Sequence, residues 1–260
     1  MPLPSLQNWE TTRDALHQAT LVVGAIRVAS SDAMMNDLQF SLEVIEGGVS
    51  STELNGGGVL KLDFATFTLI YEKDGRVIFK LDASGLTQKS LMDEVLRKLS
   101  ANGVTLQPSL KHITHDEPFN LDMQLAKAYA KTVDAIFTAL ARFRAKLAGA
   151  MTPLVIWPHH FDMAFIWFAT SAMDEHTAPH IMIGFAPFSD GKDRPYFYGY
   201  GWSKDTGYVQ VEVDDPAQSI SEGYTGLYID YDTLRASDNV NQTLEAILMQ
   251  YHHRASEMLI

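Results

Sequence analysis

The fold class is decided by the stretch Thr66-Phe-Thr-Leu-Ile-Tyr-Glu-Lys-Asp-Gly-Arg-Val-Ile-Phe-Lys-Leu81. Two runs rich in β-branched and aromatic residues flank Asp74-Gly75. An Asp-Gly pair between alternating apolar runs is the strongest short-range signal for a β-hairpin. The sequence therefore predicts adjacent antiparallel strands over Thr66–Glu72 and Arg76–Leu81.

Further strands and two helices surround this hairpin. Apolar residues that alternate with polar ones predict strands, at Asp37–Val44, Val49–Leu54 and Leu60–Phe64. Helical spacing of apolar residues predicts helices over Trp9–Ala29 and Thr87–Ala101. The first part of the chain thus reads as a helix, an antiparallel meander and a second helix.

The second part of the chain repeats this order. A long helix is predicted from an N-cap at Asn120 to about Ala148, and a last helix over Val240–Met258. Asp215-Pro216 has the chemistry of a short helix start. Strands are predicted between these helices, at Leu154–Trp157, Phe161–Thr170, His180–Ala186, Tyr196–Trp202, Gly207–Val213 and Tyr224–Tyr231.

These patterns predict an α+β fold of antiparallel sheets with helices packed on one side, in two associated halves. The predicted division is residues 1–107, a linker at 108–119 that has no periodicity, and residues 120–260. The matching order of elements leaves a duplicated unit open as one alternative. No similarity between the residues of the two halves supports it.

The composition excludes several classes of protein. The 260 residues carry 20 basic and 32 acidic side chains, and the resulting net charge of −12 argues against nucleic acid and anionic membranes as partners. The chain has no cysteine, which excludes disulfides and thiolate metal sites and fits a reducing compartment. We expect no structural zinc, and any cation should be weakly held by oxygen ligands. Neither a leader nor a membrane span is evident, so we expect a soluble cytoplasmic protein.

The densest polar cluster is Trp157-Pro-His-His-Phe-Asp162. On a strand, His160 and Asp162 would share one face, and His159 would point to the other. The pair could act as a general base with its orienting carboxylate or supply two metal ligands, which do not by themselves make a site. The bland alternative is a structural network at the entry of the strand.

The second cluster is Tyr196-Phe-Tyr-Gly-Tyr-Gly-Trp202. Alternation puts Tyr196, Tyr198, Tyr200 and Trp202 on one strand face, and the two glycines on the other, where a backbone or ligand can approach closely. If the predicted strand His180–Ala186 lies between the two clusters, one side of the sheet collects His160, Asp162, His180 and the tyrosines. That side would form either a pocket or an aromatic ladder in the core.

The residues also resemble a known family. Trp157-Pro-His-His-Phe-Asp-Met-Ala164, Ile183-Gly-Phe-Ala-Pro187 and Pro195-Tyr-Phe-Tyr-Gly-Tyr-Gly-Trp202 are similar to a bacterial domain family of unknown function. Segments near Trp9, at Gly24–Arg27 and at Tyr228–Arg235 extend the resemblance over most of the chain. Ser189-Asp-Gly191 departs from the tighter Gly-rich turn expected after the proline. The resemblance implies no activity.

The function favoured by the sequence is small-molecule binding in the second half. The ligand-binding candidates are Trp157, His159, His180, Tyr196, Tyr198, Tyr200 and Trp202. One alternative is a hydrolase-like enzyme, metal-assisted or using a general base, with His160 and Asp162 as catalytic residues. A structural or partner-binding domain is the other alternative. The sequence indicates neither a cofactor nor an oligomeric state.

Overall fold

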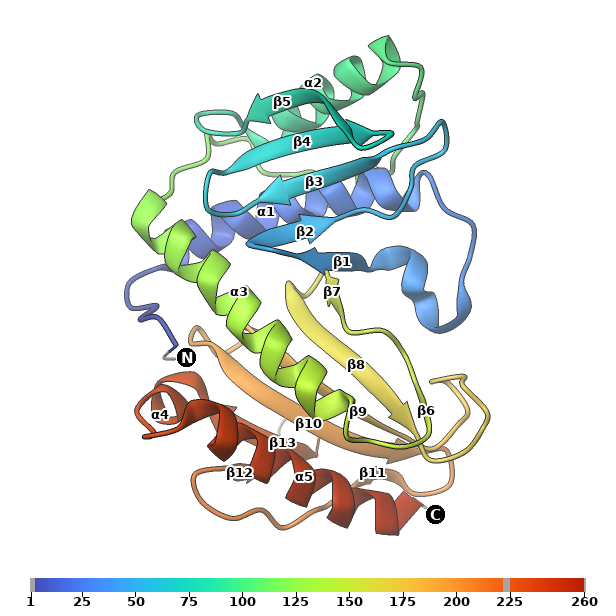
Figure 1. Cartoon of the computed structure of the whole chain (residues 1–260), viewed down its shortest axis with the longest axis vertical. Coiled ribbons are helices and arrows are strands. Elements are labelled where there is room, and N and C mark those ends of the chain that lie inside the picture. Colours follow the sequence, from blue (N-terminus) through green and yellow to red (C-terminus); the bar gives the residue numbers. More distant parts are fainter. Residues whose placement is uncertain (1–2, 222–224, 260) are drawn as a thin grey trace. The chain divides into compact units, whose positions relative to one another are not determined.

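The computed structural model describes residues 3–221 and 225–259, which fall into two compact units. The N-terminal unit contains Pro4–Asp134 and Ile156–Phe161, and the C-terminal unit contains chiefly Ala135–Val155 and Asp162–Ile260. These bounds differ from the predicted division at residues 107–120. Each unit combines helices with antiparallel strands, which confirms the α+β class (Figure 1).

The sheet of the N-terminal unit is a meander in which each strand pairs with the next. Its strands are β1 (Leu42–Ile45), β2 (Gly48–Ser50), β3 (Val59–Asp63), β4 (Thr68–Lys73) and β5 (Arg76–Asp82). The predicted hairpin is confirmed: Lys73 pairs with Arg76, and φ is 51° at Asp74 and 69° at Gly75. Positive φ at both positions is what a type I′ hairpin turn requires.

Helices α1 (Glu10–Val28) and α2 (Gln88–Ala101) lie on one face of this meander (Figure 1). The helix α2 begins with a capping box, in which Thr87 and Ser90 each accept a hydrogen bond from the other's backbone N–H. The long helix α3 (Met123–Arg144) starts later than predicted. Its cap is Asp122 and not Asn120, because the Asp122 carboxylate accepts from the Gln124 N–H at 2.7 Å.

The strand predicted at Asp37–Val44 is wrong over its first half. A 3₁₀ segment, η1 (Met35–Phe40), occupies it, and β1 begins only at Leu42. The cause is a tertiary contact: the buried Arg27 guanidinium donates to the carbonyl oxygens of Leu38, at 3.2 Å, and Ser41, at 2.8 Å. Two charge-assisted hydrogen bonds to these carbonyl groups outweigh the alternating pattern.

The predicted linker packs against α2. The fully buried side chain of Gln88 holds it: its amide nitrogen donates to the carbonyl oxygens of Gln18 and His112, both at 3.1 Å. Its amide oxygen accepts from the backbone N–H groups of Thr114, at 2.9 Å, and His115, at 3.1 Å. One glutamine therefore fixes residues 112–115 between α1 and α2.

The sheet of the C-terminal unit has the strand order β12-β13-β10-β9-β8. The short strands β6 and β11 pair with β8 and β10, respectively. The predicted position of His180–Ala186 between the strand that begins at Asp162 and the strand Tyr196–Ser203 is therefore confirmed. The strands are β6 (Ala150–Met151), β8 (Asp162–Phe168), β9 (His180–Ala186), β10 (Tyr196–Ser203), β11 (Gly207–Val209), β12 (Gln218–Ile220) and β13 (Gly226–Asp230).

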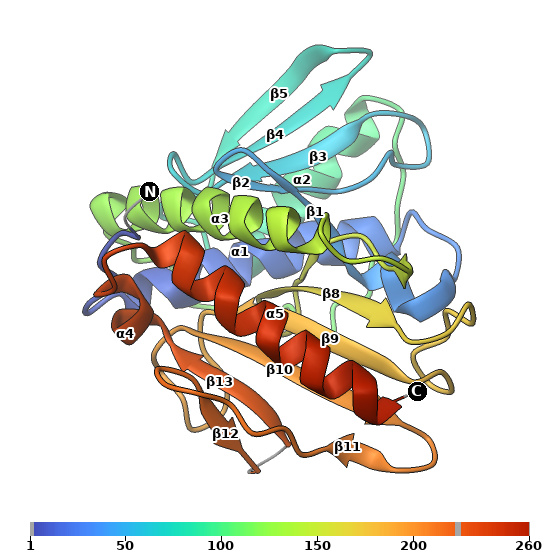
Figure 2. The same cartoon turned by 60° about the horizontal axis from the view of Figure 1, so that its bottom comes forward.

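The helix α5 (Val240–Leu259) packs on the glycine side of β10 (Figure 2). A methyl group added at Gly199 would lie 3.3 Å from the Tyr251 ring, and one at Gly201 would lie 2.6 Å from Val209 of β11 and 3.4 Å from Leu259 of α5. The two glycines therefore permit the close approach of α5 and, at Gly201, that of Val209 as well. The tyrosines of β10 point to the opposite side of the sheet.

Several predicted elements of this unit differ in the structure. The strand predicted at Gly207–Val213 ends at Val209, and Asp215-Pro216 forms a turn, not a short helix. The strand expected at Tyr224–Tyr231 is confirmed as β13, although Tyr224 lies outside the described residues. It ends where Asp230 caps a helix that the sequence analysis did not predict, α4 (Tyr231–Arg235).

Candidate functional site

The candidate residues fall into two groups, one in each unit. Trp157, His159 and His160 belong to the N-terminal unit, beside the short strand β7 (Val155–Trp157). The others belong to the C-terminal unit and lie on the side of its sheet opposite to α5. We call this side the tyrosine face and define it by Asp162, His180, Met182, Tyr196, Tyr198, Tyr200, Trp202 and Tyr228.

The register of the strands assembles the tyrosine face. On β10, Tyr198 stands opposite Gly184 of β9, and Gly184 stands opposite Ala164 of β8. Side chains two residues apart share a face, so Asp162 lies on the same side as Ala164. On the far side of β10, Tyr198 is opposite Tyr228 of β13.

A hydrogen bond crosses the middle strand of this face. The hydroxyl of Tyr198 donates to the Asp162 carboxylate, two strands away. This reach depends on Gly184, because a methyl group there would lie 2.7 Å from both Cζ and the hydroxyl oxygen of Tyr198. The bare glycine therefore gives the phenol ring its place above β9.

The tyrosine face changes from buried to exposed along β10. Asp162 and Tyr198 are each 7% exposed, whereas Tyr200 and Trp202 are half-buried. Tyr208 of β11, opposite Trp202, is 47% exposed, and its ring lies 5.4 Å from that of Tyr200. The buried carboxylate thus lies at one end of a row of rings whose other end is open to solvent.

Two loops of the same unit border the row. Ser189, in the loop that precedes β10, accepts a hydrogen bond from the hydroxyl of Tyr196 at 2.9 Å. Met173, in the loop that precedes β9, and Met182 of the tyrosine face both pack against a buried cluster that includes Ala178 of the same loop. Two loops, residues 169–179 and residues 187–195, therefore border the tyrosine face.

His180 is a neutral acceptor on this face. Its Nδ1 lies 2.9 Å from the carbonyl oxygen of Ala178. A carbonyl oxygen can only accept, so Nδ1 carries the proton and Nε2 is left as an acceptor. Burial lowers the pKa of the ring, which keeps it uncharged at neutral pH. Its neighbours are Tyr200 and Trp202, with ring centroids 6.1 and 5.4 Å away.

The histidine turn, defined as residues 157–161, forms the second group. The strand β8 begins only at Asp162, and Phe161 has a φ of 57°. The prediction that His160 and Asp162 share a strand face is therefore wrong. His159 and His160 are both exposed, with their ring centroids 4.2 Å apart.

The histidine turn is held by α1 of the same unit. Nε2 of His17 lies 2.9 Å from the carbonyl oxygen of Pro158, and its ring stacks on that of Phe161 at 5.2 Å. Burial lowers the pKa of His17 to about 4. Partial desolvation, followed by the neighbouring imidazoles of His160 and His112, lowers the pKa of His159 to about 4 as well. These rings are neutral at pH 7.

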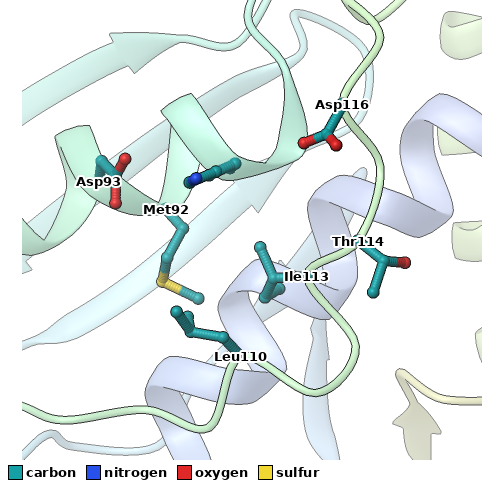
Figure 3. Close-up of a pocket in the computed structure, with 7 residues that line it drawn as sticks. Met92, Asp93, Leu110, Ile113, Thr114 and Asp116 are labelled. Carbon is teal, nitrogen blue, oxygen red and sulfur yellow. The ribbon is translucent and has the colours of Figure 1, made fainter.

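A cavity that sequence reasoning missed lies in the N-terminal unit between α2 and the segment 110–116 (Figure 3). Its volume is about 400 Å³. The side chains of Met92, Leu110 and Ile113, which line it, point toward one another (Figure 3), and Asp116 also belongs to the lining. No periodic pattern marks residues 107–119, so the sequence does not predict that this segment packs beside α2 and lines a cavity there.

Among the described residues, neither unit by itself brings three histidine or carboxylate donor atoms within 4.8 Å of one another. The structure therefore offers no ligand set within a unit on which to base a metal proposal. None of the helices in the described ranges has an apolar stretch long enough to cross a bilayer.

The fold is thus an α+β arrangement in two units, one of which presents an aromatic face with a buried carboxylate. Comparison with known proteins gives the family: the chain belongs to the family of unknown function DUF5996, whose match covers residues 1–259. The resemblance to a domain family of unknown function is thereby confirmed. No curated protein and no solved structure matches the chain.

Proposed function

We propose that the protein binds a small molecule on the tyrosine face of its C-terminal unit. The observation that carries the proposal is the contact of the Tyr198 hydroxyl with the Asp162 carboxylate across Gly184. It holds a buried acidic group next to a row of rings that opens toward Tyr208. Ligand sites typically combine aromatic walls with a few fixed polar groups.

The energetics favour a binding role over a purely structural one. Burying a carboxylate costs several kcal/mol, and replacing buried ionic or polar pairs by apolar residues is often neutral or stabilising. Trp202 and Tyr200 remain partly exposed although the other side of the same sheet is well packed. A face that keeps both an acidic group and accessible rings is better suited to a ligand than to core packing.

The enzyme alternative stays a prediction. His160 is exposed in the histidine turn, and the Asp162 carboxylate accepts from a phenol. No observation in either unit favours the use of these two residues as a catalytic pair. The remaining alternative is that the tyrosine face has a purely structural role, and a test of the proposal has to distinguish that role from ligand binding.

A thermal-shift screen of a small-molecule library would test the proposal. Ligands that bind the native state raise the melting temperature. Compounds that stabilise the wild-type protein should lose their effect on Asp162→Asn. They should keep it on Asp205→Asn, a matched carboxyl-to-amide change in the exposed turn between β10 and β11. The Asp162→Asn protein should remain folded, because the amide oxygen can still accept from Tyr198.

A distinct result would favour the structural alternative. If no compound stabilises the wild-type protein, or if every stabilising compound acts equally on Asp162→Asn, the tyrosine face is not the binding site. A severe loss of stability in Asp162→Asn with unchanged ligand shifts would identify Asp162 as part of a structural network.

A further inference from the structure

The charges around the tyrosine face are mostly negative. Asp162 lies among the rings, and Glu175 belongs to the bordering loop 169–179. Burial raises the pKa of Tyr200 above its ordinary value, and Tyr208, Glu175 and Asp162 raise it further. The charge of Asp162 also acts on Tyr196. Two carboxylates therefore act electrostatically on the same group of phenols, while His180 contributes an uncharged acceptor.

One cation already lies on a ring of this face. The ammonium nitrogen of Lys192 is 6.0 Å from the centroid of the Tyr228 ring. That ring stacks on Tyr196, with centroids 5.2 Å apart and planes at 29°, and the Tyr196 centroid is 6.2 Å from that of Tyr198. A row of tyrosines thus runs from the Lys192 ammonium group at one end to the Asp162 carboxylate at the other.

We infer that the ligand of the tyrosine face carries an organic cation, an ammonium or quaternary ammonium group, positioned over the rings beside Asp162. This inference rests on the proposed function. A cation gains from the negative faces of the aromatic rings and from the nearby carboxylates. A neutral group of the same shape gains from neither, and an anion is repelled by the carboxylates.

The half-buried Tyr200 is the ring best placed to receive the cation. It lies between the buried pair Tyr198–Asp162 and the exposed Tyr208, and Trp202 follows on the same strand face. A cation over this ring would be accessible from solvent and would remain within the field of both carboxylates. The aromatic ring of Tyr200, more than its hydroxyl group, should therefore determine the affinity for the cation.

Three probes of nearly equal shape separate charge from size: choline, 3,3-dimethylbutan-1-ol and 3,3-dimethylbutanoate. Their binding to the full chain can be followed by titration calorimetry and by tryptophan fluorescence, with Trp202→Phe identifying the signal from this face. Choline should bind, and the neutral and anionic probes should bind at least about tenfold more weakly.

Variants extend the test. Asp162→Asn should weaken choline binding about tenfold and leave the neutral probe unchanged, whereas Asp205→Asn should change neither. Tyr200→Leu should remove most of the affinity for choline, and Tyr200→Phe, which keeps the ring, should restore it. The Tyr200 pair keeps the test valid should Asp162→Asn fail to fold.

Two results would overturn the inference. If the neutral or anionic probe binds as tightly as choline and Tyr200→Leu abolishes that binding, the tyrosine face is a ligand site but not one for cations, and the proposed function stands. If choline at about 10 mM gives no heat and no fluorescence change, the cation site does not exist. The compounds from the library screen then decide the proposed function separately.

Discussion

Replacing Gly184 by alanine is the sharpest perturbation of the tyrosine face. The added methyl carbon would lie 2.7 Å from Cζ and from the hydroxyl oxygen of Tyr198, and 2.7 Å from the carbonyl oxygen of Met163. Favourable contacts of a carbon atom lie at about 3.5–4.0 Å. The phenol ring and the backbone of β8 therefore both have to move.

The expected loss has two parts. Overpacking a well-packed site costs about 1–3 kcal/mol. Loss of a hydrogen bond to a charged group, here the bond from Tyr198 to Asp162, costs a further amount of about 1.5–3 kcal/mol. We expect the free energy of unfolding to fall by about 3 kcal/mol in Gly184→Ala, since partial relaxation reduces the sum.

Urea unfolding followed by circular dichroism measures this loss. The matched control is Gly199→Ala, on the other side of the sheet, where the new methyl group would lie 3.3 Å from a carbon of the Tyr251 side chain and 3.4 Å from the carbonyl oxygen of Met182. These distances need a far smaller adjustment than the 2.7 Å contacts at Gly184, so the control should lose less than about 1 kcal/mol. Equal losses in the two variants, or no loss in Gly184→Ala, would refute the role assigned to Gly184.

The remaining predictions concern the N-terminal unit. The pKa of His17 is about 4 in the folded protein and about 6.5 in the unfolded chain, so the unfolded state binds more protons between these values. Titration of His17 should therefore lower the free energy of unfolding by about 1–2 kcal/mol between pH 7.5 and pH 5, in addition to the contribution of His159, whose pKa is lowered as well. Urea unfolding at each pH should show a fall that is smaller in His17→Gln by about this amount. Gln88→Ala leaves the carbonyl and N–H groups that Gln88 now bonds without that partner, and should cost about 2–4 kcal/mol. Limited trypsin digestion should then cleave faster after the exposed Lys111, in the segment that Gln88 holds. Thr87→Ala removes a cap of α2 and should cost about 1 kcal/mol by thermal unfolding.

Each of these predictions has an outcome that contradicts it. A pH dependence that is the same in His17→Gln would mean that other groups account for it. Unchanged cleavage after Lys111 in Gln88→Ala would show that the segment is held by other contacts. A Thr87→Ala protein as stable as the wild type would show that Ser90 alone suffices for the helix start.

The sequence predicts those parts of the fold that local pattern controls. The hairpin at Asp74-Gly75 follows from two residues that adopt positive φ readily, and the tyrosine face follows from strict alternation along β10. Both signals are contained within a few residues. No long-range contact is needed to interpret them.

The errors arise where distant residues act. The segment Asp37–Phe40 alternates like a strand, but Arg27 of α1 donates to the carbonyl groups of Leu38 and of the following Ser41, and the segment is a 3₁₀ helix. The role of Gly184 becomes visible only once the register of β8, β9 and β10 is known, because its neighbours are Tyr198 and Met163. The sequence predicts that His160 lies on a strand, but in the structure that strand begins two residues later, at Asp162.

The most direct test of the account is a fluorine NMR titration of the protein labelled with 3-fluorotyrosine. The titrant is the compound that the library screen finds to stabilise the wild-type protein most strongly, and single Tyr→Phe variants assign the resonances. The account predicts that the resonances of Tyr198, Tyr200 and Tyr208 shift with the same saturation curve, while that of Tyr71 in the N-terminal unit stays unchanged. Saturable binding without a shift at Tyr198 and Tyr200 would contradict it.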